Sequence, residues 1–355
     1  NKANMADQAI GGMFKYQTAA FKGIALGVAF HTSNNIDSDD DDSVYGLLGK
    51  DANGKHDSYT KLGEYWIQGE WFNTKIKYGA QEISTPFVNN HDARMTPKVY
   101  EGLSVVNKSI DNLELSLYYI TGFSDRTDTE FSDVAYSFNK NMDDNPLFAA
   151  GAKYTLKAGN ARITPQAWYY TIQDGFNFIY TDVLLSAKAG DFTFSAKPMY
   201  LVQKATGDKD GGDLDTYQFG GVVTAKAYSA DVSLYYAKTG EDAISLPWGH
   251  SRVISQQVNA STRADEDAYG VKVGYDFSKI GLKGLSFSVF HAMYDVPDKD
   301  GDLAETDYDL TYKFPDFLKG LSLKARYADI NADAKNGDYV DKRVYMIYTA
   351  AFGGK

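Results

Sequence analysis

The sequence predicts an all-β fold, a transmembrane antiparallel β-barrel of about 18 strands, with about 17 of them within this chain. Three observations predict it. Segments of about ten residues alternate between apolar and polar side chains, short and long connections follow one another, and aromatic residues gather at segment ends. Period-two alternation places the two kinds of side chain on opposite faces of a strand. An outer-membrane barrel has this pattern because lipid surrounds it and water fills it.

The composition of the chain fits such a barrel. Its 355 residues include 27 Tyr, 20 Phe and 32 Gly but no Cys, and its mean hydropathy is −0.40. No apolar run approaches the roughly 18 residues that a membrane-spanning helix needs. A barrel averages to low hydropathy because its apolar outside and polar inside cancel. The net charge of −11 argues against nucleic-acid binding, which favours a basic surface.

The alternation is clear in six segments. In the first, Ile24, Leu26, Val28 and Phe30 alternate with small residues. The others span residues 72–79, 113–119, 217–226, 269–276 and 321–327.

Short and long connections alternate between these segments. We expect tight turns at 19–21, 69–71, 110–112, 158–160, 189–191 and 228–230. We expect long polar loops near 34–58, 84–99, 124–146, 205–214, 240–266, 296–304 and 331–338, with one brief exception at 173–175. Outer-membrane barrels have this asymmetry between periplasmic turns and external loops, whereas a soluble sandwich has no reason to keep it.

The parity of the strands points to a segment before the first residue. The last strand, near 340–352, ends in the periplasm, and the first, near 8–19, runs inward from outside. A barrel with both ends in the periplasm has an even number of strands. We therefore expect one further strand upstream of Asn1, and we expect residues 1–355 to form a single barrel domain.

Aromatic residues lie near both ends of the predicted strands, as in the girdles at membrane interfaces. Those near short turns are Trp71, Phe72, Phe176, Phe178, Phe192, Tyr228 and Phe314. Those near long loops are Trp168, Tyr169, Tyr170, Tyr200, Tyr235, Tyr236 and Tyr294. Pro165 and Pro198 fall inside predicted strands, where each removes a ladder hydrogen bond. We expect bulges or rim positions there.

Enzyme signatures are missing from the sequence. The five His residues are scattered without metal-ligand spacing, and no Gly-x-Ser-x-Gly, P-loop or Cys nucleophile occurs. We therefore expect no enzyme activity, no catalytic residue and no resident cofactor. The acidic runs at 39–42 and 208–215 offer oxygen ligands for Ca²⁺, but neither matches an EF-hand. Solvated loops, or loops bridged to lipopolysaccharide through divalent ions, are the alternatives.

Basic residues recur on the face that the alternation assigns to the interior. They are Lys77, Lys153, Arg162, Lys188, Lys197, Lys226, Lys272, Lys324, Arg326 and Arg343. Bases spaced along a wall can pass anions or carboxylates from one to the next. The alternative is that any water-filled interior needs charged side chains, and most of the surplus acid lies in the loops.

Several segments resemble known outer-membrane porins. In the OprD-like family, a strand ending in Gly-x-Gln leads into a Pro-containing inward loop, followed by Arg-x-x-Pro and a closing Gly. The matching positions here are Gly79, Gln81, Pro86, Arg94, Pro97 and Gly102.

The resemblance extends over nearly the whole chain. Residues 9–18 and 320–327 are similar to the second and penultimate strands of the family. Residues 105–110 and 163–201 resemble the major outer-membrane porins of epsilonproteobacterial type. The chain departs from the family at its end, because three residues follow Phe352 where the assembly signal usually stops at the terminal aromatic.

The resemblance implies an eighteen-stranded barrel in the bacterial outer membrane, through which ions and small hydrophilic solutes diffuse passively. Amino acids or carboxylates are among the solutes expected. It also implies that loop 84–99 folds inward as the constriction, where charges would set a transverse field. Those charges are His91, Asp92, Arg94 and Lys98.

Other interpretations stay open. Loop 84–99 would otherwise be external, with solvated charges, and the barrel would otherwise be structural or adhesive, with its loops as binders. Members of the family differ between anionic and cationic preference, so the sequence leaves selectivity open. Expected partners are the solutes, outer-membrane lipid and lipopolysaccharide, and a homotrimer and a monomer are both reasonable.

Overall fold

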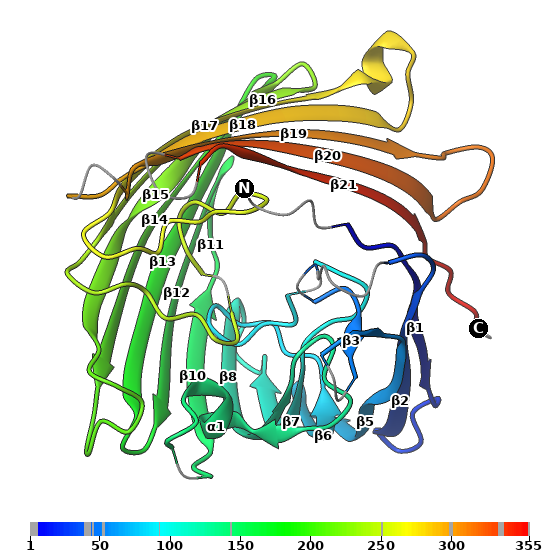
Figure 1. Cartoon of the computed structure of the whole chain (residues 1–355), viewed down its shortest axis with the longest axis vertical. Coiled ribbons are helices and arrows are strands. Elements are labelled where there is room, and N and C mark those ends of the chain that lie inside the picture. Colours follow the sequence, from blue (N-terminus) through cyan, green and yellow to red (C-terminus); the bar gives the residue numbers. More distant parts are fainter. Residues whose placement is uncertain are drawn as a thin grey trace.

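The computed structural model describes residues 6–38, 44, 46–51, 54–91, 93–142, 144–249, 251–297, 301–332 and 337–353. Its wall strands form one antiparallel sheet that curves around a central space, and several loops enter that space (Figure 1). None of the helices in the described part of the chain is long and apolar enough to cross a membrane.

The elements follow the predicted alternation of strands and connections. The wall strands are β1 (Ala9–Gln17), β2 (Ile24–Asn35), β5 (Tyr59–Trp71), β6 (Thr74–Gln81), β7 (Val99–Asn107), β8 (Leu113–Ser124), β10 (Leu147–Tyr154), β11 (Leu156–Ala158), β12 (Ala161–Ile172), β13 (Phe176–Ala189), β14 (Phe192–Ala205), β15 (Asp215–Ala227), β16 (Ala230–Thr239), β17 (Asp267–Asp276), β18 (Leu285–Asp295), β19 (Leu303–Lys313), β20 (Leu321–Ala332) and β21 (Tyr339–Tyr348). Short elements in the connections are β3 (Gly49–Lys50), β4 (His56–Asp57), β9 (Ser132–Asp133), α1 (Val134–Phe138) and η1 (Phe277–Ile280).

Among the described residues, the main sheet has 19 strands. The two-residue β9 is an extension in a loop, and β11 continues β10 past Thr155, so 17 strands make up the wall, as predicted. Each wall strand pairs antiparallel with its neighbours along the chain, while β3 and β4 form a separate small ladder. Within the described residues, β1 pairs with β2 alone and β21 pairs with β20 alone. The strand expected upstream of Asn1 lies outside this sequence and stays a prediction.

Most of the tight turns lie where the sequence predicts them. At the turn between β15 and β16, Tyr228 and Ser229 have φ values of 51° and 72°. Positive φ at both central residues gives the hairpin twist that matches the flanking strands. The turn predicted at 69–71 is wrong by a few residues, because β5 continues to Trp71 and the turn is formed by Phe72 and Asn73.

The two prolines lie in one row of the wall, which contradicts the expected bulges. Pro165 of β12 is in register with Val183 of β13, and Pro198 of β14 is in register with Gly221 of β15. The pairing between β13 and β14 skips Val183 and Pro198 without a change of register. The strand breaks between β10 and β11 at Thr155, beside Pro165. The missing N–H groups interrupt the ladder instead of adding a residue to it.

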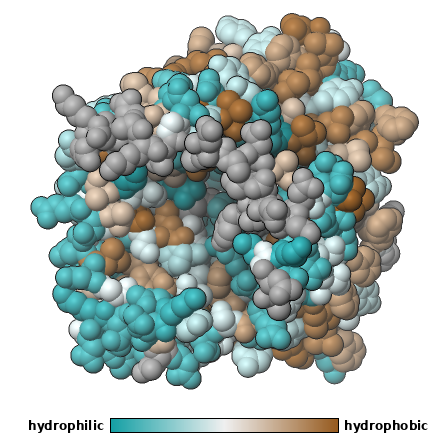
Figure 2. All heavy atoms as spheres, in the orientation of Figure 1, coloured by the Kyte–Doolittle hydropathy of each residue, from teal (hydrophilic) through white to brown (hydrophobic). Residues whose placement is uncertain are grey.

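The outer surface of the barrel is apolar. Large side chains such as Ile10, Phe14, Leu26, Leu117 and Leu234 are exposed on the outward positions of their strands. Figure 2 shows hydrophobic residues along the outer flank at the right of the view, near β1 and β2. Such a surface is stable in a hydrocarbon environment.

Candidate functional site

Two long loops enter the barrel and meet inside it. The first connects β6 to β7 and spans residues 82–98, and the second connects β16 to β17 and spans residues 240–266. The backbone N–H of Asn89 donates to the carbonyl oxygen of Trp248 at 3.0 Å. The ammonium group of Lys98 donates to the carbonyl oxygen of Pro247 at 2.9 Å. The loops therefore support each other across more than a hundred residues of sequence.

The first loop packs on an apolar section of the wall. Phe87 is 2% exposed, and its ring centroid lies 5.4 Å from those of Tyr170 and Phe178 and 6.0 Å from that of Tyr180. Edge-on aromatic contacts of this kind are favourable beyond the area that they bury. Residues from β12 and β13 thus hold the loop inside the barrel.

These contacts correct part of the predicted aromatic girdles. Trp168, Tyr170, Phe176 and Phe178 are buried in the cluster around Phe87 instead of lying at the lipid interface. The sequence places them correctly at strand ends, but period two assigns them to the inner face, where the loop covers them. Aromatic content alone does not distinguish a girdle residue from one that anchors a loop.

Tyr100 of β7 ties both loops to the wall. Its side chain is fully buried, and its hydroxyl lies 2.7 Å from the carbonyl oxygen of Asn89 and 2.8 Å from that of Trp248. A buried carbonyl without a hydrogen-bond donor is unfavourable. The single proton of this hydroxyl can be donated to either carbonyl, and the Trp248 carbonyl also accepts from the backbone N–H of Asn89.

The structure brings some of the predicted constriction residues together. Nδ1 of His91 lies 2.8 Å from Nη2 of Arg126, and Nζ of Lys98 lies 3.8 Å from Oδ1 of Asp125. Burial lowers the pKa of Lys98. Asp92 lies outside the described residues.

Arg94 lies on the side of the loop that faces β21. Burial lowers the pKa of its guanidinium, and the positive charge of the predicted wall base Arg343 lowers it further. Tyr345 and Asp341 of β21 oppose this shift. A predicted constriction residue and a predicted wall base thus interact electrostatically, beside an acid that offsets part of their charge.

The wall bases of β20 and β21 lie on inner positions and are partly paired with acids. Nε of Arg326 lies 2.5 Å from Oδ1 of Asp309, and Nε of Arg343 lies 2.7 Å from Oδ1 of Asp341. Lys324, on the same face of β20, is half-buried. The acids therefore offset some of the positive charge that the sequence suggests.

The other predicted wall bases lie on other strands than β20 and β21, and Lys77 of β6 lies near Glu82 at the start of loop 82–98. Nζ of Lys77 lies 4.1 Å from the ring centroid of Trp66, a cation–π contact. Arg162, Lys188 and Lys226 are exposed side chains near the tight turns of β12, β13 and β15. The structure does not bring these three together with Arg94.

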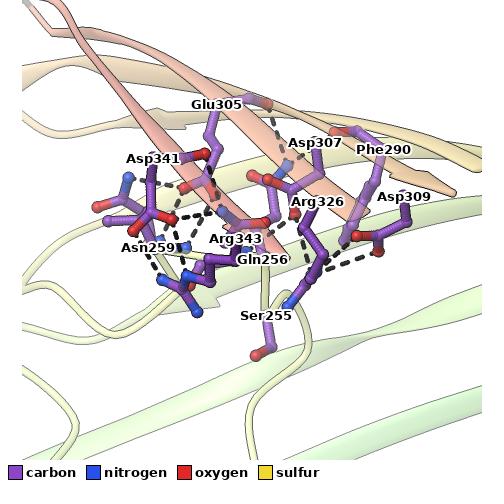
Figure 3. A network of polar contacts seen from close by, with 12 residues as sticks. Ser255, Gln256, Asn259, Phe290, Glu305, Asp307, Asp309, Arg326, Asp341 and Arg343 are labelled. Atoms are coloured by element: carbon purple, nitrogen blue, oxygen red, sulfur yellow. Dashed lines mark hydrogen bonds and ion pairs between the residues drawn. The ribbon is translucent and has the colours of Figure 1, made fainter. Parts of the chain in front are cut away.

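A second network of hydrogen bonds, which the sequence does not predict, anchors the second loop to the wall. The turn at Gln256–Asn259 in the second loop lies against the inner face of β18, β19 and β21 (Figure 3). Glu305, Asp307 and Asp309 face inward at alternate positions of β19. That acidic alternation inside a predicted strand is a signal that could have drawn attention to β19.

In and beside the acidic run 208–215, two Asp side chains form ion pairs with neighbouring Lys side chains. Nζ of Lys209 lies 2.7 Å from Oδ1 of Asp213, and Nζ of Lys204 lies 3.3 Å from Oδ1 of Asp215. No group of three or more potential metal-ligating side chains occurs within the described residues. The run at 39–42 lies outside them.

Comparison with known proteins identifies the family. The family model described as outer membrane porin, OprD family, matches residues 8–352. Porin-like protein GalP of Pseudomonas putida is 21% identical over 217 residues, which cover 60% of this chain and about half of that protein, 52% of its length.

Solved structures of other outer-membrane proteins have the same fold. OpdK of Pseudomonas aeruginosa, crystallised with vanillate, has a TM-score of 0.87 and 21% identity, over 96% of this chain and 92% of OpdK. OccAB3 of Acinetobacter baumannii has a TM-score of 0.86 and 22% identity, over 96% of this chain and 92% of OccAB3. The family match spans nearly the whole chain, so this chain belongs to the OprD family of outer membrane porins, proteins of the bacterial outer membrane.

Proposed function

We propose that the protein is a passive channel for small hydrophilic solutes, with a preference for carboxylates, and that its narrowest part lies where loops 82–98 and 240–266 meet. The solute gradient alone drives the flux. Arg94, with His91 on the same loop, would act on the solute at this level, and Lys324, Arg326 and Arg343 would act from the wall. Lys98 is buried and would instead join the two loops.

The observation that carries the proposal is the half-buried Arg94 on a loop that the second loop and the wall hold inside the barrel. Burial and the charge of Arg343 disfavour the charged form of Arg94, whereas Tyr345 and Asp341 favour it, so an anion that enters beside Arg94 would gain favourable interactions with its guanidinium group. Planar guanidinium groups match the geometry of a carboxylate. The vanillate in the OpdK crystal structure is a small carboxylate, which supports this solute class here.

The test is the variant Arg94→Gln in planar bilayers. Removal of one positive charge from the narrowest part should shift the reversal potential in a KCl gradient toward cation preference. It should also slow the swelling of proteoliposomes in benzoate more than in a neutral sugar of similar size. The control is Lys209→Gln, which removes one base from an exposed external loop.

Two results would contradict the proposal. If Arg94→Gln and Lys209→Gln gave the same reversal potential as the wild type, Arg94 would not lie at the constriction. If the wild-type protein showed no conductance steps at all, the structural or adhesive barrel would be the better explanation. A homotrimer, and contacts of the acidic loops with lipopolysaccharide through divalent ions, stay predictions that cross-linking in intact membranes would test.

A further inference from the structure

We propose that Glu305 is a positioning residue that holds the turn Gln256–Asn259 against the wall and thereby sets the aperture of the channel. This inference rests on the proposed channel function. Glu305 and the three N–H donors that it binds in the turn are called the carboxylate clasp here.

The carboxylate clasp has an unusually complete set of contacts. Oε1 of Glu305 accepts a hydrogen bond from the backbone N–H of Val258 at 2.9 Å. Oε2 accepts from the backbone N–H of Asn259 at 2.7 Å and from its side-chain Nδ2 at 2.8 Å. Glu305 is 0% exposed. A buried carboxylate is stable only with such donors, and charged acceptors form stronger hydrogen bonds than neutral ones.

The turn is closed on itself and therefore moves as one unit. The backbone N–H of Gln256 donates to the carbonyl oxygen of Asn259 at 2.9 Å, and Ser255 and Ala260 form an antiparallel bridge. Neutral hydrogen bonds supplement the clasp, because Nε2 of Gln256 donates to the carbonyl oxygens of Phe290 and Glu305. Figure 3 shows these side chains converging on the inner face of the wall.

The turn also fixes a charge in the channel. The carbonyl oxygen of Gln257 accepts from Nη2 of Arg343 at 3.0 Å, and Nε2 of Gln257 donates to Oδ1 of Asp341 at 2.6 Å. Arg343 is the wall base that faces Arg94. Release of the turn would therefore widen the passage and free a guanidinium at the same level.

The test compares Glu305→Gln with Asp309→Asn. In Glu305→Gln, an amide NH₂ replaces one carboxylate oxygen and faces N–H donors, so at least one contact of the clasp becomes repulsive. Asp309 lies on the same face of the same strand and contacts Arg326. Asp309→Asn therefore makes the same change of charge and leaves the clasp intact.

Two measurements are made on both variants. The first is single-channel conductance. The second is the mobility of a spin label at Val258→Cys, a position that is 38% exposed, in a chain that has no other Cys. We expect Glu305→Gln to raise the conductance roughly twofold, since conductance follows the cross-section of the narrowest part, and to give a mobile component in the spectrum. Asp309→Asn should keep the label immobile.

Equal conductance and equal label mobility in the two variants would overturn the proposal. If Glu305→Gln does not insert into membranes, Asn259→Pro removes both the backbone N–H and the side-chain amide that Oε2 of Glu305 binds, and leaves the wall unchanged. Wild-type conductance and an immobile label in that variant would also overturn it. If the wild type does not conduct, the channel function fails, whereas the spin label still reports on the clasp.

Discussion

At the scale of single residues, the proposed function makes the charges of loop 82–98 the groups that a solute would meet. Glu82 follows β6 directly, and its Oε2 accepts a hydrogen bond from Nδ2 of Asn90 at 2.6 Å. Its Oε1 lies 3.7 Å from Nζ of Lys15. Burial raises the pKa of Glu82, and the neighbouring Glu64 raises it further, whereas Lys15 and Asn90 oppose the shift.

The raised pKa predicts a pH-dependent selectivity. Because its pKa is raised, Glu82 takes up a proton at a higher pH than an ordinary glutamate does. As the pH falls, the start of loop 82–98 therefore loses its negative charge before the exposed acids lose theirs. We expect relative anion permeability to rise between pH 7 and pH 5 in the wild type and to rise less in Glu82→Gln. The measurement is the reversal potential at the two pH values, with Asp208→Asn in the exposed loop between β14 and β15 as control. An identical pH shift in Glu82→Gln and the wild type would exclude this role.

At the scale of elements, strands were predictable from the sequence because their period is local. The turn predicted at 69–71 is wrong because Gly69 and Glu70 resemble turn residues. In the structure both belong to β5, and the ring of Trp71 packs over Gly69. The inward course of the second loop could not be predicted, since its anchor, Asn259 to Glu305, joins residues 46 apart. No local pattern distinguishes that loop from an external one.

One aromatic side chain, Phe87, packs the first loop on the wall, in addition to the hydrogen bonds of Tyr100. Removal of a well-packed Phe side chain lowers stability by about 3–5 kcal/mol. For Phe87 we expect this loss to weaken the packing of the loop on the wall, while the pairing of the strands is unchanged. We expect Phe87→Ala to raise single-channel conductance while the barrel still shows the heat-dependent gel mobility of a folded barrel. Phe72→Ala, at an exposed turn, is the matched control. A Phe87→Ala channel with wild-type conductance would show that other contacts suffice.

At the scale of the whole molecule, the barrel has an apolar outside and a polar inside because successive residues of each strand face opposite sides of the wall. Two adjacent residues of β15 test this directly. Val223 is 57% exposed on the outer face, whereas Val222 is half-buried on the inner face.

We expect Val223→Arg to lower the free energy of unfolding in lipid vesicles by about 2–4 kcal/mol, because a cation on the lipid face is unfavourable near the bilayer centre. Val222→Arg should change it much less, because its side chain enters the water-filled interior. Urea titrations of both variants measure the difference. Equal losses would mean that the two faces are not assigned as described.

The row that contains Pro165 and Pro198 has a mechanical consequence for the envelope. A sheet resists bending chiefly through its continuous ladder, and here the ladder is interrupted across neighbouring strands at one height. Lateral pressure from the bilayer would therefore deform the wall along this line before it strains the opposite side. The cylinder is thus compliant in one sector, while the sector that carries β15 to β18 keeps a continuous ladder and stays stiff.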